Sequence, residues 1–251
     1  MNKISAVVIT KNEETNIQHC LKSIRWVDEI IVYDSGSTDR TVELAKEFGA
    51  QVHIGEWLGF GATKKKATSL ANNHWILSID ADEVVSDLLA EEIKLLLQSK
   101  LSEDTAYLIP RKSYFLNRWI THGGWYPDYQ KKFFNRLKSN WDNAEIHEKV
   151  ISKNSLKMHR DLHHFVFKNI EHQVQTNNRY STLLAKQLFD AKKFSTVYHI
   201  LFKPMVKFFE CYFFKCGFLD GYSGFVIARN ASYSVFLKWT KLKEMHDQKN
   251  T

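Results

Sequence analysis

Four short apolar runs in the first 100 residues each precede a segment with helical spacing, and this alternation constrains the fold more than any other feature. The apolar runs, which predict buried strands, span 4–9, 29–33, 51–54 and 75–79. The segments that predict helices span about 17–24, 42–48, 63–72 and 86–98. Strands and helices that alternate in this way form a parallel sheet covered by helices. The sequence therefore predicts an α/β fold.

Polar clusters follow three of these strands at the point where each strand ends. They are Thr10 to Glu13, Asp34 to Asp39 and Asp80 to Glu83. Ligands of open parallel sheets bind outside the carboxyl ends of the strands. We therefore expect the three clusters to converge on one rim and to form a site there.

Asp80 and Asp82 stand two residues apart directly after a buried strand. Two such carboxylates can share Mg²⁺ or Mn²⁺, and the metal would stabilise a diphosphate as a leaving group. Alternatively, Asp82 could cap the helix that follows. Asp34 could similarly accept hydrogen bonds from a base or a ribose, or it could form the turn in which it stands.

Further candidates for binding and catalysis lie outside these clusters. Lys64 follows a Gly-Phe-Gly segment and could approach a diphosphate, although the run Lys64–Lys66 could instead form a solvated helix face. His163 and His164 could supply an imidazole to the metal. A general base near the acceptor hydroxyl contributes roughly 10²–10⁴-fold to the rate. The candidates for that role are Asp128, Glu145, His147 and Glu148.

After residue 100 we expect two more strands, at 106–111 and 129–135, and helices at about 170–189, 197–213 and 225–243. We divide the chain into a catalytic domain of residues 1–190 and a basic, aromatic, helical C-terminal region of residues 191–251. In the C-terminal helices the apolar residues recur with a period of 3.6, so their aromatic face could pack on the catalytic domain or bind an anionic membrane.

Charge is divided unequally along the chain. Residues 1–150 hold 19 Lys or Arg against 21 Asp or Glu, whereas residues 151–251 hold 16 against 7. The basic residues mingle with Phe at helical core spacing, and the sequence contains no recognised DNA- or RNA-binding motif. We therefore expect no nucleic-acid partner.

Three observations indicate the cellular setting. The three cysteines are too few for a disulfide scaffold. No apolar run reaches 18 residues, so no ordinary spanning helix is expected. The first residues enter a strand pattern directly and lack the layout of a signal peptide. We therefore expect a cytoplasmic protein.

Together these segments resemble the family 2 glycosyltransferases with the GT-A fold. The shared segments are ISAVVITKNEE, EIIVYDSGSTDRT and WILSIDADE. The match also includes EWLGFGATKKKA, GGWYPDYQKKFF and EIHEKV. Two narrower segments, GGWYPD and GFLDGYSGF, look like those of the lipopolysaccharide core enzymes that add a β-1,4-linked glucose to the first heptose. The resemblance covers most of the chain.

The resemblance implies an inverting transfer from UDP-glucose to a lipid-linked core heptose with a divalent metal, at the inner face of the bacterial inner membrane. Thr10, Asn12 and Glu13 match the family's first nucleotide loop, and Asp34 matches its uracil- or ribose-binding acid. Asp80 and Asp82 match the D-x-D motif, in which Asp80 also binds substrate. Lys64 falls where the subgroup places a lysine. The family's E-D pair is missing, and His147-Glu148 looks like its substitute, so Glu148 or Asp128 is expected to be the base.

Three alternative functions remain. A family 2 enzyme could use another sugar donor or another acceptor. A nucleotidyltransferase would also use strand-end acids and a metal, but it would show a Gly- and Arg-rich loop after the first strand. A nucleic-acid-binding protein would use the basic C-terminal region.

Overall fold

The computed structural model describes residues 2–142 and 148–249. The chain forms two compact units. The first unit contains residues 1–111 and 128–164, and the second contains residues 112–127 and 165–251.

The first unit is built on four parallel strands in the order β3-β2-β1-β4. Every residue of β1 is buried, as expected for a parallel strand that is covered on both faces. The strands are β1 (Ile4–Thr10), β2 (Glu29–Asp34), β3 (Gln51–Ile54) and β4 (Trp75–Asp80). All four strands were predicted from the apolar runs.

Helices cover both faces of this parallel sheet. Ile4, Ala6 and Val8 of β1 pack in one apolar cluster with the buried residues of α1, α2 and α4. Val7 and Ile9, which point to the opposite face, pack with α3 in a second cluster. The helices are α1 (Ile17–Ser23), α2 (Thr41–Glu47), α3 (Phe60–Ser69) and α4 (Asp87–Gln98).

Antiparallel strands extend the sheet beyond β4, in the order β8-β6-β12-β5. They are β8 (Asp128–Asn135), β6 (Thr105–Phe115), β12 (Leu162–His164) and β5 (Glu83–Val85). β11 (Asn154–Lys157) lies beside β6, while β9 (Asn140–Trp141) and β10 (Val150–Ile151) form a separate pair. The β5–β12 pairing sets His164 opposite Glu83. Neither of these three-residue strands was predicted, because each is too short to show a periodic pattern.

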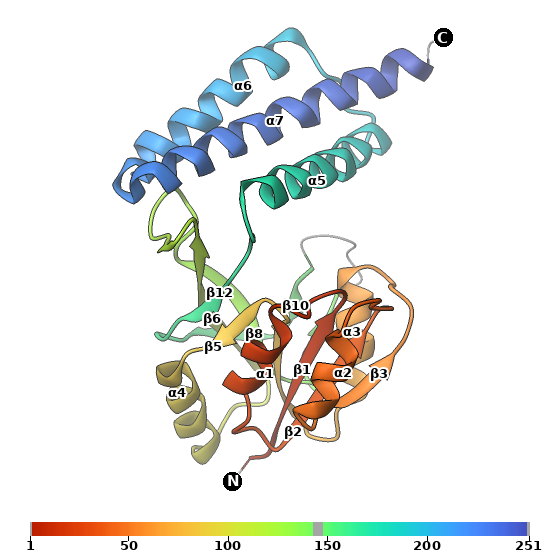
Figure 1. Cartoon of the computed structure of the whole chain (residues 1–251), viewed down its shortest axis with the longest axis vertical. Coiled ribbons are helices and arrows are strands. Elements are labelled where there is room, and N and C mark those ends of the chain that lie inside the picture. The colour runs from red at the N-terminus through yellow and green to blue at the C-terminus, as the bar shows by residue number, and fades with distance from the viewer. Residues whose placement is uncertain (1, 143–147, 250–251) are drawn as a thin grey trace. The chain divides into compact units, whose positions relative to one another are not determined.

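The second unit is mainly helical. β7 (Arg118–Trp119) pairs with the last residues of β6. The helices are α5 (Ile170–Asp190), α6 (Val197–Phe209), a π-helical turn η1 (Glu210–Phe214), a 3₁₀ turn η2 (Gly217–Asp220) and α7 (Gly221–Lys249). α7 packs against both α5 and α6 (Figure 1). α7 begins four residues before its predicted start.

The start of the GGWYPD motif, residues 123–127, and the GFLDGYSGF motif, residues 217–225, both belong to the second unit. The buried carboxylate of Asp220 accepts hydrogen bonds from the backbone N–H groups of Thr121 and His122, at 3.2 and 2.8 Å. The N–H of Gly123 donates to the carbonyl of Lys215 at 2.8 Å. A Cβ on Gly224 would lie 1.8 Å from the carbonyl oxygen of Gly217, so this position requires glycine.

The predicted fold class is confirmed: a mainly parallel central sheet with flanking helices is followed by C-terminal helices. Residue 190 is the last of α5, and a division into domains at that residue stays a prediction. In the described part of the chain, no helix combines the length and the apolar character needed to cross a bilayer.

Candidate active site

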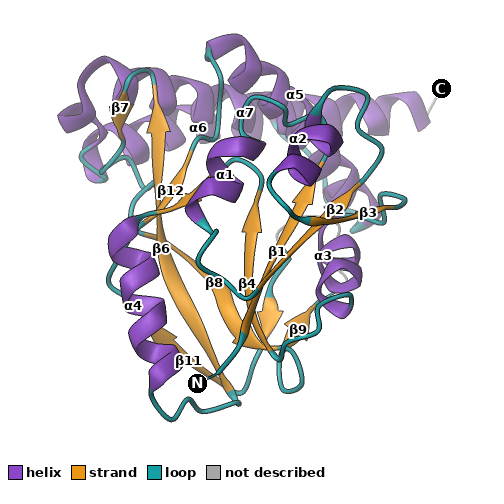
Figure 2. Cartoon of the chain, turned by 60° about the horizontal axis from the view of Figure 1, so that its bottom comes forward, coloured by secondary structure: helices purple, strands orange, loops and turns teal. Residues whose placement is uncertain are grey.

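The three polar clusters meet at one rim of the parallel sheet. β1, β2 and β4 run in the same direction (Figure 2), and their registers pair Thr10 with Asp34 and Ile9 with Asp80. The carboxyl ends of three strands are thus adjacent, which is where α/β sheets bind ligands.

Asp80, the last residue of β4, is held by two buried lysines. Lys64 of α3 places its Nζ 3.0 Å from Asp80 Oδ1, and Lys132 of β8 places its Nζ 2.8 Å from Oδ2. Of the run Lys64–Lys66, only Lys64 is buried, whereas the other two lysines are exposed. Lys64 therefore belongs to the candidate site, whereas Lys65 and Lys66 form the solvated helix face.

Both lysines connect Asp80 to further carboxylates. Lys64 Nζ donates to Glu148 Oε1 at 2.6 Å, and Lys132 Nζ donates to Glu83 Oε2 at 2.7 Å. Arg111 of β6 then joins Glu83, at 3.2 Å, to Asp128, at 2.6 Å. The result is a chain of alternating charge: Glu148, Lys64, Asp80, Lys132, Glu83, Arg111 and Asp128. We call these seven side chains the charge network, and its two ends are the two candidate bases.

Three members of the charge network, Asp80, Lys64 and Arg111, have pKa values shifted toward their charged forms. Burial opposes ionisation of Asp80, but Lys132 and Lys64 hold the pKa of its carboxyl well below the ordinary value. Burial also opposes the charge on Lys64, yet Asp80 and then Glu148 raise the pKa of its ammonium group. Burial acts against Arg111 as well, but Glu83 and Asp128 raise the pKa of its guanidinium. Asp80 is therefore a carboxylate in neutral solution.

The two candidate bases differ in how their oxygens are engaged. Asp128 Oδ2 accepts from Arg111 Nε and Nη2 at 2.9 and 2.6 Å, and its Oδ1 accepts from Gln130 at 2.7 Å. Glu148 accepts on Oε1 from Lys64. Glu145 and His147, the other predicted candidates, lie outside the described residues.

Asp82 lies beside an imidazole. Its Oδ2 is 3.3 Å from Nε2 of His164, and the carboxylate is partly exposed. Ser86, not Asp82, caps α4, because the N–H of Leu89 donates to the Ser86 hydroxyl at 3.2 Å. Among residues 2–142 and 148–249, no three His, Cys, Asp or Glu side chains are grouped as a complete metal site.

The pair of Asp82 and His164 nevertheless fits a nucleotide-bound cation. The Asp82 carboxylate is a type of ligand that suits Mn²⁺ and Mg²⁺, and the His164 imidazole beside it is a second potential ligand. Mg²⁺ in nucleotide sites commonly takes one or two protein carboxylates and completes its shell with phosphate oxygens and water. Asp80 fits this role less directly, because its oxygens face the two lysines.

The loops after β1 and β2 are bound to each other. Asn12, at φ 55°, donates its N–H to the Ser37 hydroxyl and accepts from the N–H of Thr38, both at 2.8 Å. The N–H of Glu13 donates to the hydroxyl of Thr41 at 2.8 Å. The first two polar clusters thus form one continuous surface.

Asp34 and Thr10 lie buried at the base of this surface. Asp34 Oδ1 accepts from the N–H groups of Gly36 and Ser37 at 3.0 and 2.8 Å, so the predicted turn is present. The hydroxyl of Thr10 is buried and has no hydrogen-bond partner within the described residues. A buried polar atom without a partner is uncommon and is consistent with a ligand that completes it.

Sequence reasoning did not identify Lys132 or Arg111 as parts of the site, and it included Glu83 only as the last residue of the third polar cluster. Lys132 stands in a predicted strand between charged and aromatic residues, and it is almost fully buried. Side chains two residues apart in a strand share a face, and Phe134 is buried on the same face as Lys132. This alternation was the feature of the sequence that could have indicated that Lys132 is buried. Nothing in the sequence shows that β8 pairs with β4 or that β6 pairs with β8.

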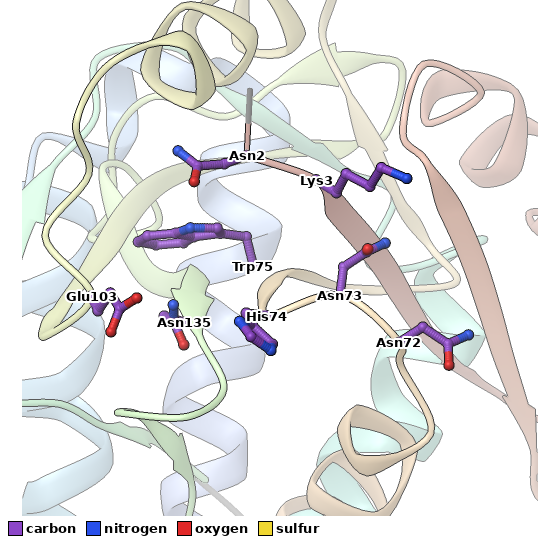
Figure 3. A pocket seen from close by; sticks show the side chains of 8 residues that line it. All are labelled: Asn2, Lys3, Asn72, Asn73, His74, Trp75, Glu103 and Asn135. Carbon is purple, nitrogen blue, oxygen red and sulfur yellow. The ribbon is translucent and has the colours of Figure 1, made fainter.

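A pocket lies at the end of the parallel strands that is opposite to the rim. It is lined by Asn2, Lys3, residues 72–75, Glu103 and Asn135 (Figure 3). Asn2 and Lys3 precede β1 and Trp75 begins β4, so this pocket is at the amino ends of the parallel strands. It contains no residue of the charge network.

Comparison with known proteins decides the family. The family model described as glycosyl transferase family 2 matches residues 5–160, which is more than half of the chain and includes all three strand-end clusters. The chain belongs to the family 2 glycosyltransferases. The resemblance inferred from the sequence is thus confirmed at the level of the family.

Two relatives match the glycosyltransferase along nearly its whole length. An uncharacterized glycosyltransferase of Rickettsia bellii is 32% identical, over 99% of this chain and 88% of the relative. LpsC of Rhizobium meliloti, a lipopolysaccharide core biosynthesis glycosyltransferase, is 28% identical over 97% of this chain and 93% of the relative.

A solved structure is also similar to part of the glycosyltransferase. It is glucosyl-3-phosphoglycerate synthase from Mycobacterium tuberculosis in complex with Mn²⁺, UDP and glucosyl-3-phosphoglycerate. The identity is 27% and the TM-score is 0.37, over 45% of this chain and 44% of that chain. The match therefore spans less than half of that protein's length.

Proposed function

We propose that the glycosyltransferase transfers a hexose, with glucose from UDP-glucose as the first candidate, to a heptose of a lipid-linked lipopolysaccharide core. The supporting observation is the rim itself, where Asp82 and His164 lie beside the charge network and the two ends of that network are the two candidate bases. The likeness to LpsC supports a core-sugar acceptor. An enzyme with such an acceptor would work at the cytoplasmic face of the inner membrane, in peripheral contact with anionic lipid.

In this proposal the loops after β1 and β2 bind the nucleoside. Thr10 offers its buried hydroxyl, and Asn12 and Glu13 shape the loop that covers the nucleotide. Asp34 would bond the ribose or uracil through the oxygen that now accepts from the Ser37 hydroxyl. Lys64 keeps a positive charge near the diphosphate while it holds Asp80.

Asp82 and His164 would hold Mg²⁺ or Mn²⁺, which would neutralise the diphosphate of the leaving UDP. Asp80, fixed by Lys64 and Lys132, would orient the donor sugar or the water around the cation. A carboxylate at one end of the charge network accepts the proton of the acceptor hydroxyl. That hydroxyl attacks C1 from the face opposite UDP, so the configuration at C1 is inverted.

Substitution of Glu148 by Gln is expected to lower kcat roughly 10²- to 10⁴-fold, the usual contribution of a general base. Asp128→Asn should lower it less, because hydrogen bonds from Arg111 and Gln130 already engage both oxygens of Asp128. The two purified variants are compared by UDP release with acceptor present, and binding of UDP serves as the control for a folded site. Normal turnover by both variants would exclude both residues as the base.

The donor and acceptor are tested by transfer assays with a panel of nucleotide sugars and a truncated core lipid, in the presence of Mn²⁺. We expect product with UDP-glucose and an inverted anomeric configuration by NMR. Product only from another donor would retain the family and replace the sugar. Incorporation of a nucleotidyl group with release of pyrophosphate would instead identify a nucleotidyltransferase.

A further inference from the structure

The solvent-exposed face of α6 is apolar, whereas the exposed face of a surface helix is ordinarily polar. Its exposed residues are the pairs 197–198, 201–202 and 205–206, and Phe209, with 48% to 70% of each residue accessible. At 100° per residue these positions fall within one half of the helix circumference. Within α6 this half contains no charged residue.

The opposite half of α6 makes the contacts with the rest of the second unit. The hydroxyl of Ser232 in α7 donates to the carbonyl of Pro204 at 2.7 Å. His199 stacks on Trp239 with ring centroids 4.1 Å apart. Ile200 packs against the cluster that contains Trp239 and Leu242. The apolar half is therefore not the one that anchors α6 in its unit.

Aromatic side chains continue this surface beyond α6. Phe209 stacks on Phe213 of η1 with centroids 5.5 Å apart. Phe214 is 84% exposed, and Phe218 and Leu219 of η2 are also exposed. We name the exposed apolar residues from Val197 to Leu219 the aromatic face. Exposed apolar residues gathered in this number are typical of an interaction site.

Basic residues accompany the aromatic face. Residues 191–249 contain ten Lys or Arg and four Asp or Glu. Lys207 and Lys215 form ion pairs with Glu210. The Nζ of Lys203 lies over the ring of Trp239, 4.5 Å from its centroid. Burial, and then the positive charges of Lys203 and Lys207, lower the pKa of Lys238. An anionic surface is the charge complement of this region.

We propose that the aromatic face binds an anionic phospholipid bilayer, with α6 lying in the plane of the interface. Helices with apolar residues on one face and lysines on the opposite, polar face bind membranes in this way, and Lys203 and Lys207 lie on that opposite half of α6. Lysines near the surface add affinity for anionic lipid. The proposal rests on the proposed function only in that a lipid-linked acceptor would lie in such a bilayer. A second copy of the chain would cover the apolar residues but would bring the same positive charges together.

The test is flotation of the full chain with vesicles of phosphatidylcholine, alone or with about 30 mol % phosphatidylglycerol. We expect binding to the anionic vesicles, which weakens as salt rises. Leu201→Ser with Met205→Ser should lower the partition coefficient at least about tenfold, because two exposed apolar side chains no longer insert. The matched control, Leu88→Ser with Leu95→Ser, changes two equally exposed leucines on α4 and should leave binding unchanged.

Equal binding by the wild type and the Leu201→Ser, Met205→Ser variant would overturn the proposal, as would no binding to either vesicle. A dimer seen by light scattering, and abolished by that variant, would assign the aromatic face to a second copy instead. Binding of UDP with Mn²⁺ is measured on the same samples without vesicles. A wild-type protein that binds UDP but neither kind of vesicle would contradict this proposal and leave the proposed function standing.

Discussion

Replacement of Asp82 by alanine is expected to lower transfer about 10³-fold, which corresponds to about 4 kcal/mol in the activation free energy. The reason is that the carboxylate beside His164 would be lost from the proposed cation site while the charge network stays intact. The fold should be unaffected, because Asp82 is partly exposed and Ser86 caps α4. Turnover and the melting temperature of the variant are the measurements.

Asp87→Ala is the matched control for Asp82→Ala. Asp87 is an exposed acid in the first turn of α4, five residues further along the chain. Its removal should lower stability by less than about 1 kcal/mol, through the helix dipole, and leave transfer unchanged. If Asp82→Ala turned over at the wild-type rate, the assignment of Asp82 to the cation would be wrong.

Lys132→Met is expected to destabilise the first unit by about 3–5 kcal/mol, the usual effect of leaving a buried charge without its partner. Glu83 is fully buried and Asp80 is largely so, and both carboxylates lose a lysine at less than 3 Å. Urea denaturation followed by tryptophan fluorescence measures the change.

The neighbouring Lys131→Met variant separates this effect from a general loss of charge on β8. Lys131 Nζ donates to the carbonyl of Val150 and to the Ser152 hydroxyl, in a less buried position. We expect a loss of about 1 kcal/mol from these hydrogen bonds. Equal destabilisation by the two variants would show that the network does not depend on Lys132.

Most of the first unit was predictable from local patterns, because each parallel strand is a short apolar run between turn signals. The pairing of β5 with β12 was not, since it joins residues almost 80 positions apart and each strand has three residues. That pairing brings His164 next to Asp82. The sequence suggested a histidine for the metal but left two, His163 and His164, and the register distinguishes them.

The candidate site, like the fold, could be predicted in part. Acids at the ends of β2 and β4 follow from strand order alone, whereas Lys132 and Arg111 reach the rim from the antiparallel strands. Their positions depend on tertiary packing that a single sequence does not reveal. The period of 3.6 in α6 likewise left open whether its aromatic residues are buried, and the described structure exposes half of the helix.

Calorimetric titration of UDP into the protein, with and without Mn²⁺, tests the central claim most directly. The claim is that the rim formed by β1, β2 and β4 binds a nucleotide diphosphate together with a cation held by Asp82 and His164. We predict that UDP binds with Mn²⁺, that EDTA weakens the binding strongly, and that Asp82→Ala abolishes the effect of the metal. Equal affinity for UDP with and without metal, unchanged in Asp82→Ala, would contradict it.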